Sequence, residues 1–183
     1  RSEILPAESN VMTAGTIRIE RTVEGTGYVY GIVLNVAAPA AGNAVATVTF
    51  AEDAPWSSLD TVVYRDVNGE LLNLTGYDLC IANLAQKQYA FRFWDASALF
   101  NTIAGGIATS GTFNFWIRVP IALNRRSLSG LVGNQDRSQK YSIRTDQAGS
   151  GAVYATTPTT LSTIAINKQY ENYAVPLAVN PDG

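Results

Sequence analysis

The chain has 183 residues, with 13 basic and 15 acidic side chains, one cysteine and no histidine. Only 15% of its residues are charged, whereas an average globular domain has about 25%. Without histidine, this chain cannot build Ser-His-Asp or Cys-His catalytic groups, nor metal sites that need imidazole ligands. The net charge of −2 argues against a nucleic-acid-binding domain, because such domains carry a basic face.

The first predicted strands alternate between polar and apolar residues or are apolar throughout. Residues 16–23 alternate, which predicts a strand buried on one face. Residues 28–36 are nearly continuous in apolar character, which predicts a strand covered on both faces. Gly31 within it predicts a bulge or a close approach of another group. Residues 45–50 alternate again and predict a further strand.

A hairpin and a helix follow. The apolar runs 61–65 and 70–74 flank Asp66-Val67-Asn68-Gly69, and Asn-Gly between two such runs is the strongest short hairpin signal. Residues 76–88 are the only segment with a helical pattern. We expect its apolar stripe to consist of Leu79, Ala82 and Leu84. Cys80 lies in the apolar sequence CIANL, so we expect a buried and unreactive thiol.

The remaining segments also have strand patterns. Residues 89–94 are predicted to be extended, and residues 112–121 alternate. One face of that second strand has Phe113, Phe115, Ile117 and Val119, and the other has Asn114, Trp116, Arg118 and Pro120. Because proline donates no hydrogen bond, Pro120 predicts a strand end or an edge. The last predicted extended segments are 139–145, 152–156, 159–166 and 168–175.

These elements predict the fold class. About eight strands and one short helix occur without alternating βα units, which excludes a doubly wound parallel sheet. We therefore expect an all-β fold, an eight-stranded antiparallel jelly-roll sandwich with one short helix.

Neither acids nor aromatic residues form a clear catalytic or binding pattern. Asp66 and Glu70 flank the hairpin and could meet, as the two carboxylates of a glycosidase must, but turn and surface positions explain both. The three tryptophans could form a sugar-stacking platform, although core or interface packing explains Trp94 and Trp116 better. We expect no catalytic, cofactor-binding or metal-binding residues, and hence no enzyme.

Three segments resemble tectivirus-type major capsid proteins. In residues 112–135 an aromatic-rich strand runs into Val-Pro and is followed by a turn and an Asn-Gln pair. Residues 55–79 are similar to the family's strand, Asn-Gly hairpin and short helix, and residues 169–183 to the crossing between its two barrels. The matching positions in the first segment are Phe115, Val119, Pro120, Arg126, Leu128, Gly130, Asn134 and Gln135.

The resemblance implies a structural subunit of a virion. In that family two jelly-roll barrels stand upright in the shell, and three copies form a pseudo-hexameric capsomer of an icosahedral, usually membrane-containing capsid of a tailless dsDNA virus. It implies copies of the chain as partners, together with minor capsid and penton proteins and an internal membrane. It also implies assembly in the host cytoplasm. Few basic residues argue against direct nucleic-acid binding.

The length departs from the family, whose members are usually much longer. We expect residues 1–167 to form one viral jelly-roll barrel. Residues 168–183 would form the crossing toward a second barrel that this chain does not include. The alternative hypothesis is a carbohydrate-binding jelly-roll module, lectin-like or receptor-binding, with exposed aromatic residues on one concave face.

The expected interface between copies uses one strand face and the loop after it. Trp116 and Arg118 share that strand face, and both residue types are enriched at binding hot spots. The loops 95–111 and 124–138 are the other expected contact segments. The candidate interface residues are Trp116, Arg118, Arg125, Arg126, Leu128 and Gln135.

Overall fold

The computed structural model describes residues 2–4, 8–23, 27–38, 48–86, 111–121, 132–134, 141–158, 161 and 163–173. The strands are β1 (Ser2–Ile4), β2 (Glu8–Val11), β3 (Ile17–Thr22), β4 (Gly27–Ala38), β5 (Thr49–Phe50), β6 (Leu59–Arg65), β7 (Glu70–Leu74), β8 (Phe113–Pro120), β9 (Val132–Asn134), β10 (Ser142–Gln147), β11 (Tyr154–Thr156) and β12 (Thr163–Tyr173). The helical elements are the 3₁₀ turn η1 (Trp56–Ser58), α1 (Gly76–Gln86) and α4 (Ser150–Val153).

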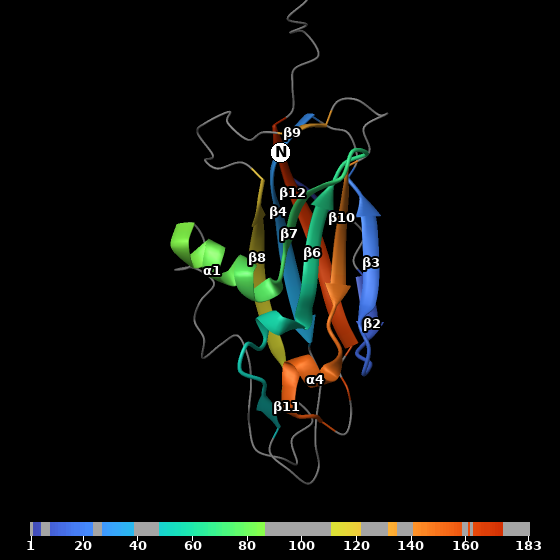
Figure 1. The fold of residues 1–183 in the computed structure, drawn as a ribbon, viewed down its shortest axis with the longest axis vertical. Helices are drawn as coiled ribbons and strands as arrows, with labels where there is room; N and C mark the ends of the chain where they lie inside the picture. Colours follow the sequence, from blue (N-terminus) through green and yellow to red (C-terminus); the bar gives the residue numbers. More distant parts are fainter. Residues whose placement is uncertain are drawn as a thin grey trace, which may run out of the picture.

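Two antiparallel sheets lie face to face (Figure 1). The larger sheet has the order β1-β12-β4-β8, with β2 also paired to β12 and β9 to β4. The smaller has the order β3-β10-β6-β7, and β5 pairs with β11 separately. Every strand pair is antiparallel. The expected all-β antiparallel architecture is therefore confirmed.

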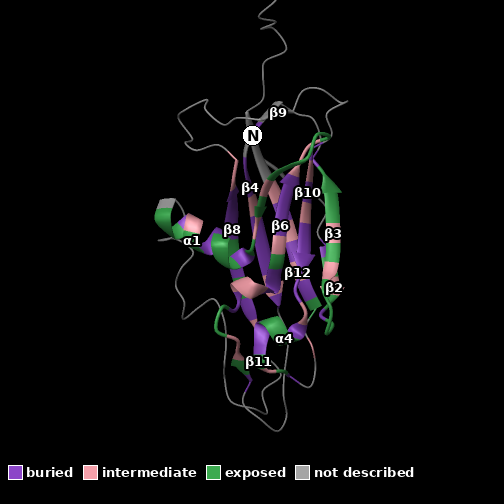
Figure 2. Ribbon diagram, in the orientation of Figure 1, coloured by how far each residue is buried: buried purple, intermediate pink, exposed green. Residues whose placement is uncertain are grey.

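The core lies between these sheets and is organised around β4. β4 pairs with β12 along one side and with β8 and β9 along the other. Leu34 lies opposite both Ile117 and Lys168, so alternate residues of the three strands share the core face. In Figure 2 the colour for buried residues runs along much of β4, β6, β8 and β10. The core side chains include Ile32, Leu34, Val36, Val62, Tyr64, Phe115, Ile117, Val119, Ile143, Ile164 and Ile166.

The predicted strand 28–36 and its glycine are confirmed. Most described residues of β4 are buried and the others half-buried. A Cβ on Gly31 would lie 2.6 Å from Nη2 of Arg118, so this position requires the absence of a side chain. The β12 register also shifts between Glu171 and Asn172, which forms a bulge beside Gly31.

The hairpin of residues 61–74 is confirmed. The Asp66 N–H donates to the Gly69 carbonyl over 3.0 Å. Oδ1 of Asp66 accepts from the backbone N–H of Asn68 at 2.7 Å and of Gly69 at 3.0 Å. Gly69 has φ 151°, which disfavours any residue with a Cβ. The turn chemistry therefore explains why the sequence prediction succeeded here.

Helix α1 is confirmed, but the three residues of its predicted apolar stripe differ in burial. Leu79 and Cys80 are buried and Ala82 is half-buried, whereas Leu84 is 40% exposed. Asn83 is buried instead, because its side-chain amide bonds the backbone of β8. Its Oδ1 accepts from the Arg118 N–H at 3.1 Å, and its Nδ2 donates to the Arg118 carbonyl at 2.8 Å. This polar contact fixes which face of α1 points inward.

The later strands differ from the predicted boundaries. The predicted strand 152–156 begins as the helical turn α4 and is extended only from Tyr154. The predicted segments 159–166 and 168–175 contain a single strand, β12, because pairing with β4 continues from Ala165 to Tyr173. β12 thus spans the expected boundary at residue 167. The described residues contain twelve strand segments rather than about eight, including β1 and β2. Residues 45–47 and 89–94 lie outside the described residues.

A buried ion cluster joins the edges of the two sheets. Nζ of Lys168 on β12 lies 2.8 Å from Oε2 of Glu8 on β2, and Nε of Arg21 on β3 contacts Oε1 of the same carboxylate. Lys168 is 0% exposed, and this burial lowers the pKa of its ammonium group from 10.5, opposed by the hydrogen bond to Glu8. Glu8 therefore compensates a charge that would otherwise be very costly to bury.

We expect Glu8→Gln and Lys168→Met to have unequal effects. Glu8→Gln leaves the Lys168 charge buried without a counter-ion and lowers the free energy of unfolding by about 3–5 kcal/mol. Lys168→Met leaves Glu8 paired with Arg21 and costs about 1 kcal/mol. Urea unfolding of both variants measures the difference. Equal losses would contradict the role assigned to Glu8.

Candidate assembly surfaces

The described residues lack the groupings that a metal site or a membrane span requires. They contain no group of three His, Cys, Asp or Glu side chains placed to hold a metal ion. None of their helices has the length and apolar character needed to cross a membrane. Cys80 is buried as expected, and burial raises the pKa of its thiol to about 11. At neutral pH the thiol is protonated, which makes it a poor nucleophile.

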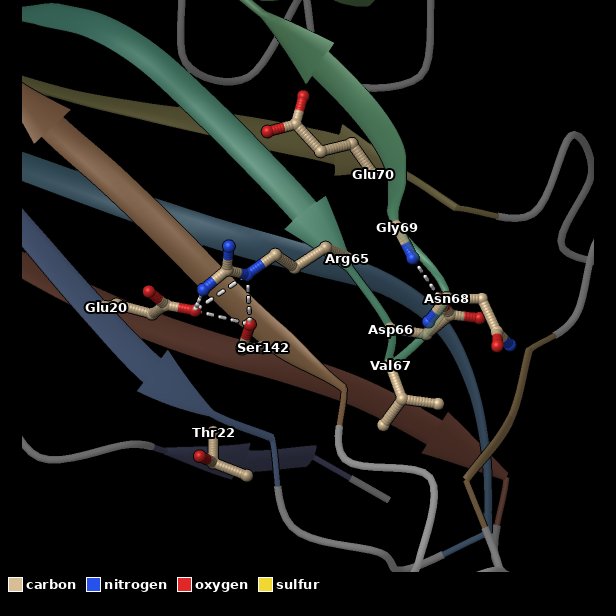
Figure 3. A pocket seen from close by; sticks show the side chains of 9 residues that line it. All are labelled: Glu20, Thr22, Arg65, Asp66, Val67, Asn68, Gly69, Glu70 and Ser142. Atoms are coloured by element: carbon tan, nitrogen blue, oxygen red, sulfur yellow. Dashed lines mark hydrogen bonds and ion pairs between the residues drawn. The ribbon is translucent and has the colours of Figure 1, made fainter.

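One polar pocket of about 480 Å³ lies beside the β6–β7 hairpin (Figure 3). Oε1 of Glu20 accepts from Oγ of Ser142 at 2.7 Å and from Nε of Arg65 at 2.9 Å. The Ser142 hydrogen bond, aided by the Arg65 guanidinium, holds the pKa of Glu20 below its ordinary value of 4.5. Glu20 is therefore a stable carboxylate rather than a proton donor, whereas a general acid needs a raised pKa.

Asp66 and Glu70 both line this pocket, so the structure brings the predicted pair to one place. Oδ1 of Asp66 is occupied by the turn N–H groups. Oε2 of Glu70 accepts from Nδ2 of Asn73 at 2.9 Å. In Figure 3 the Glu70 side chain points away from Asp66. The contacts of both acids are those of a stabilised turn.

The aromatic side chains do not gather at the pocket. Its lining contains no Trp, Tyr or Phe among the described residues. Trp56 is half-buried and packs against the core, and Trp94 lies outside the described residues. Trp116 on β8 and Tyr77 on α1 are exposed, by 40% and 42%. The described residues thus give no observation that favours the carbohydrate-binding alternative.

The predicted interface residues fall into three groups. Trp116 is 40% exposed on the outer face of β8. Arg118 shares that face but is only 3% exposed, with its guanidinium over Gly31. The predictions for Arg125, Arg126, Leu128 and Gln135 lie outside the described residues.

An apolar stripe on α1 was missed by the sequence analysis. Tyr77, Ile81 and Leu84 are 42%, 46% and 40% exposed. Their spacing of four and three residues places them on one helix face. Figure 2 shows α1 beside β8, at the side of the sandwich. The spacing of these apolar residues in the sequence could have revealed the stripe. Spacing alone does not show whether a helix face packs inside the chain or is exposed on its surface.

Strand β8 ends the described path of the larger sheet. Edge strands present backbone groups that can pair with another chain, and proteins usually cover them. Asn83 covers β8 at one position, by bonding both backbone groups of Arg118. Apolar side chains of α1 and the outer face of β8 together form a candidate contact surface.

No family model matches the sequence, and no curated protein matches it. Among the solved structures with a similar fold, two come from virus studies. The crystal structure of the STIV major capsid protein matches with a TM-score of 0.64 and 13% identity, over 93% of this chain and 48% of that chain. A chain in the atomic structure of Sulfolobus Turreted Icosahedral Virus matches with a TM-score of 0.58 and 14% identity, over 94% and 45%.

The chain shares the jelly-roll fold of these two structures. This confirms the predicted fold class. The chain spans about half the length of both matched proteins. The first of these structures is a major capsid protein, and the second belongs to a virus.

We expect Asp66→Ala and Glu70→Gln to separate turn stabilisation from the catalytic alternative. Asp66→Ala removes two acceptor contacts of the turn and lowers the free energy of unfolding by about 1–2 kcal/mol. Glu70→Gln retains an acceptor for Asn73 and changes it by less than about 0.5 kcal/mol. Thermal or urea unfolding measures both. A hydrolytic activity of the wild type that either variant abolished would contradict the turn interpretation.

Proposed function

We propose that the chain is a structural subunit of a viral capsid. The observation that carries the proposal is the similarity to the STIV major capsid protein, which extends over 93% of this chain. On this proposal the protein works in the virion, after assembly in the host cytoplasm, and its main partners are copies of itself. Minor capsid proteins, penton proteins and an internal membrane are its further proposed neighbours.

The surface chemistry supports a protein that packs against its own copies. Charged residues make up only 15% of the chain, which limits repulsion between identical copies. Tyr77, Ile81 and Leu84 form an outward apolar stripe, and apolar groups outside the core favour contacts with another chain. Trp116 adds an exposed residue of the type enriched at binding hot spots.

The finer proposal is a tectivirus-type arrangement. Three copies would form a pseudo-hexameric capsomer of an icosahedral shell, in which each chain supplies two barrels. The match to about half of the STIV protein supports one barrel for the 183 residues. The intact mass of the protein recovered from virions tests this part. A mass well above 19.6 kDa is expected, and 19.6 kDa would favour a single-barrel capsid protein.

We expect the purified protein to form trimers, and Ile81→Lys to weaken them. The substitution places a charge in the α1 stripe, where association would have to desolvate it. Light scattering over a range of concentrations should give a mass of at least three copies for the wild type and a lower mass for the variant.

Leu71→Lys is the matched control for this experiment. Leu71 is 51% exposed on β7, and Ile81 is 46% exposed on α1, so both changes replace an exposed aliphatic residue with lysine. The control should remain trimeric. A wild type that stays monomeric at high concentration would contradict the proposed function, and equal effects of the two variants would contradict the role of α1.

A further inference from the structure

The outward faces of the two sheets differ in charge. We call the outward face of the larger sheet the charge-poor face. By strand register it includes Ser9, Val11, Val33, Asn35, Ala37, Asn114, Trp116, Arg118, Thr163, Ala165, Asn167, Gln169 and Glu171. Among its described side chains only Arg118 is charged, and Arg118 is 3% exposed. Apart from the position of Glu171, a neighbour could cover this face without desolvating an exposed charge.

The outward face of the smaller sheet has the opposite character. Arg18 and Arg144 both pair with the Asp146 carboxylate, at 3.4 and 3.3 Å, and Arg65 pairs with Glu20. The side chains of Arg18 and Arg65 are 67% and 40% exposed. Covering these groups would desolvate several charges. The contrast between the faces indicates that the smaller sheet faces solvent and the larger sheet a partner.

A row of amides crosses the charge-poor face. Nδ2 of Asn35 donates to Oδ1 of Asn114 at 2.7 Å, and Nδ2 of Asn167 donates to Oδ1 of Asn35 at 3.2 Å. The row thus links β12, β4 and β8. Asn35 at its centre is only 8% exposed, although its side chain points out of the sandwich. Each amide has both donors and acceptors, so the outer two can also bond a partner.

We propose that the charge-poor face packs against the same face of a second copy and so joins one trimer to the next. This inference rests on the proposed function and identifies a partner surface for it. Contacts within a trimer join two different surfaces of each copy, whereas a two-fold contact uses one surface twice. The face-to-face contact is therefore a contact between trimers.

The strand order makes this face suited to a two-fold contact. Asn35 and Asn167 are register partners on the two central strands, β4 and β12. A two-fold axis parallel to the strands between them places Asn35 of one copy over Asn167 of the other, and the reverse. The amide rows of the two copies then lie against each other and run in opposite directions across the strands. Because an amide group can donate and accept, the row is complementary to itself.

The size and composition of the face are sufficient for such a contact. Four strands at about 4.8 Å spacing and about 3.3 Å per residue cover roughly 15–20 Å by 25–30 Å. The flat area is therefore about 375–600 Å², which is smaller than the standard area of about 800 Å² per partner and close to the lower bound of roughly 500 Å² per partner for a specific interface. Interface cores are depleted in charge and enriched in tryptophan. Among the described side chains of this face, Arg118 is the one charged residue and is buried, and Trp116 is exposed.

The test places charge in the amide row. The double variant Asn114→Asp, Asn167→Asp puts two carboxylates beside Asn35 in each copy, so a two-fold contact would bring four together. Asn68→Asp, in the exposed hairpin turn, is the control. Sedimentation velocity should show trimers and larger assemblies for the wild type and the control, and trimers alone for the double variant.

A second pair of variants keeps the test valid if the double variant does not fold. Val11 on the charge-poor face and Val67 in the hairpin are both 59% exposed. Val11→Lys should stop assembly at the trimer, and Val67→Lys should not. Wild-type protein that forms trimers and nothing larger would overturn this proposal alone, as would variants that assemble like wild type. Monomeric wild type would overturn the proposed function as well.

Discussion

The structure depends on burying β4, a strand of twelve residues whose described side chains are all buried or half-buried. One face is covered by the smaller sheet, through the apolar core. The other face of β4 carries the half-buried Val33 and Ala37 and the buried amide of Asn35. None of its described positions has an exposed charge. A strand of this kind is typical of a sheet with a layer on each side. Within the proposed assembly, the second layer comes from another copy.

The ends and edges of the sandwich are held by specific polar contacts. Glu8 neutralises Lys168 where β2, β12 and β3 meet, and Asn83 occupies the edge of β8. Asp66 closes the hairpin. In each case a side chain satisfies charged or backbone groups that would be costly to bury alone. The polar chemistry of the described residues thus stabilises the fold, which agrees with a structural role.

Local signals explain which parts of the fold were predictable from sequence. The Asn68-Gly69 turn, the alternation of β8 and the apolar β4 each follow from short-range chemistry. The bounds of β12 and the inward face of α1 depend on contacts far along the chain, with β4 and with Arg118. The Glu8–Lys168 pair joins residues 160 positions apart, so no local pattern could indicate it. For the same reason, the sequence placed Arg118 at an interface but could not show its burial over Gly31.

Electron microscopy of the full-length protein tests the central claim most directly. In the proposed assembly, copies of this chain associate through outward surfaces that carry little charge. We therefore expect trimeric particles with a pseudo-hexameric outline that join into larger arrays. Uniform single-barrel particles at high protein concentration would contradict it.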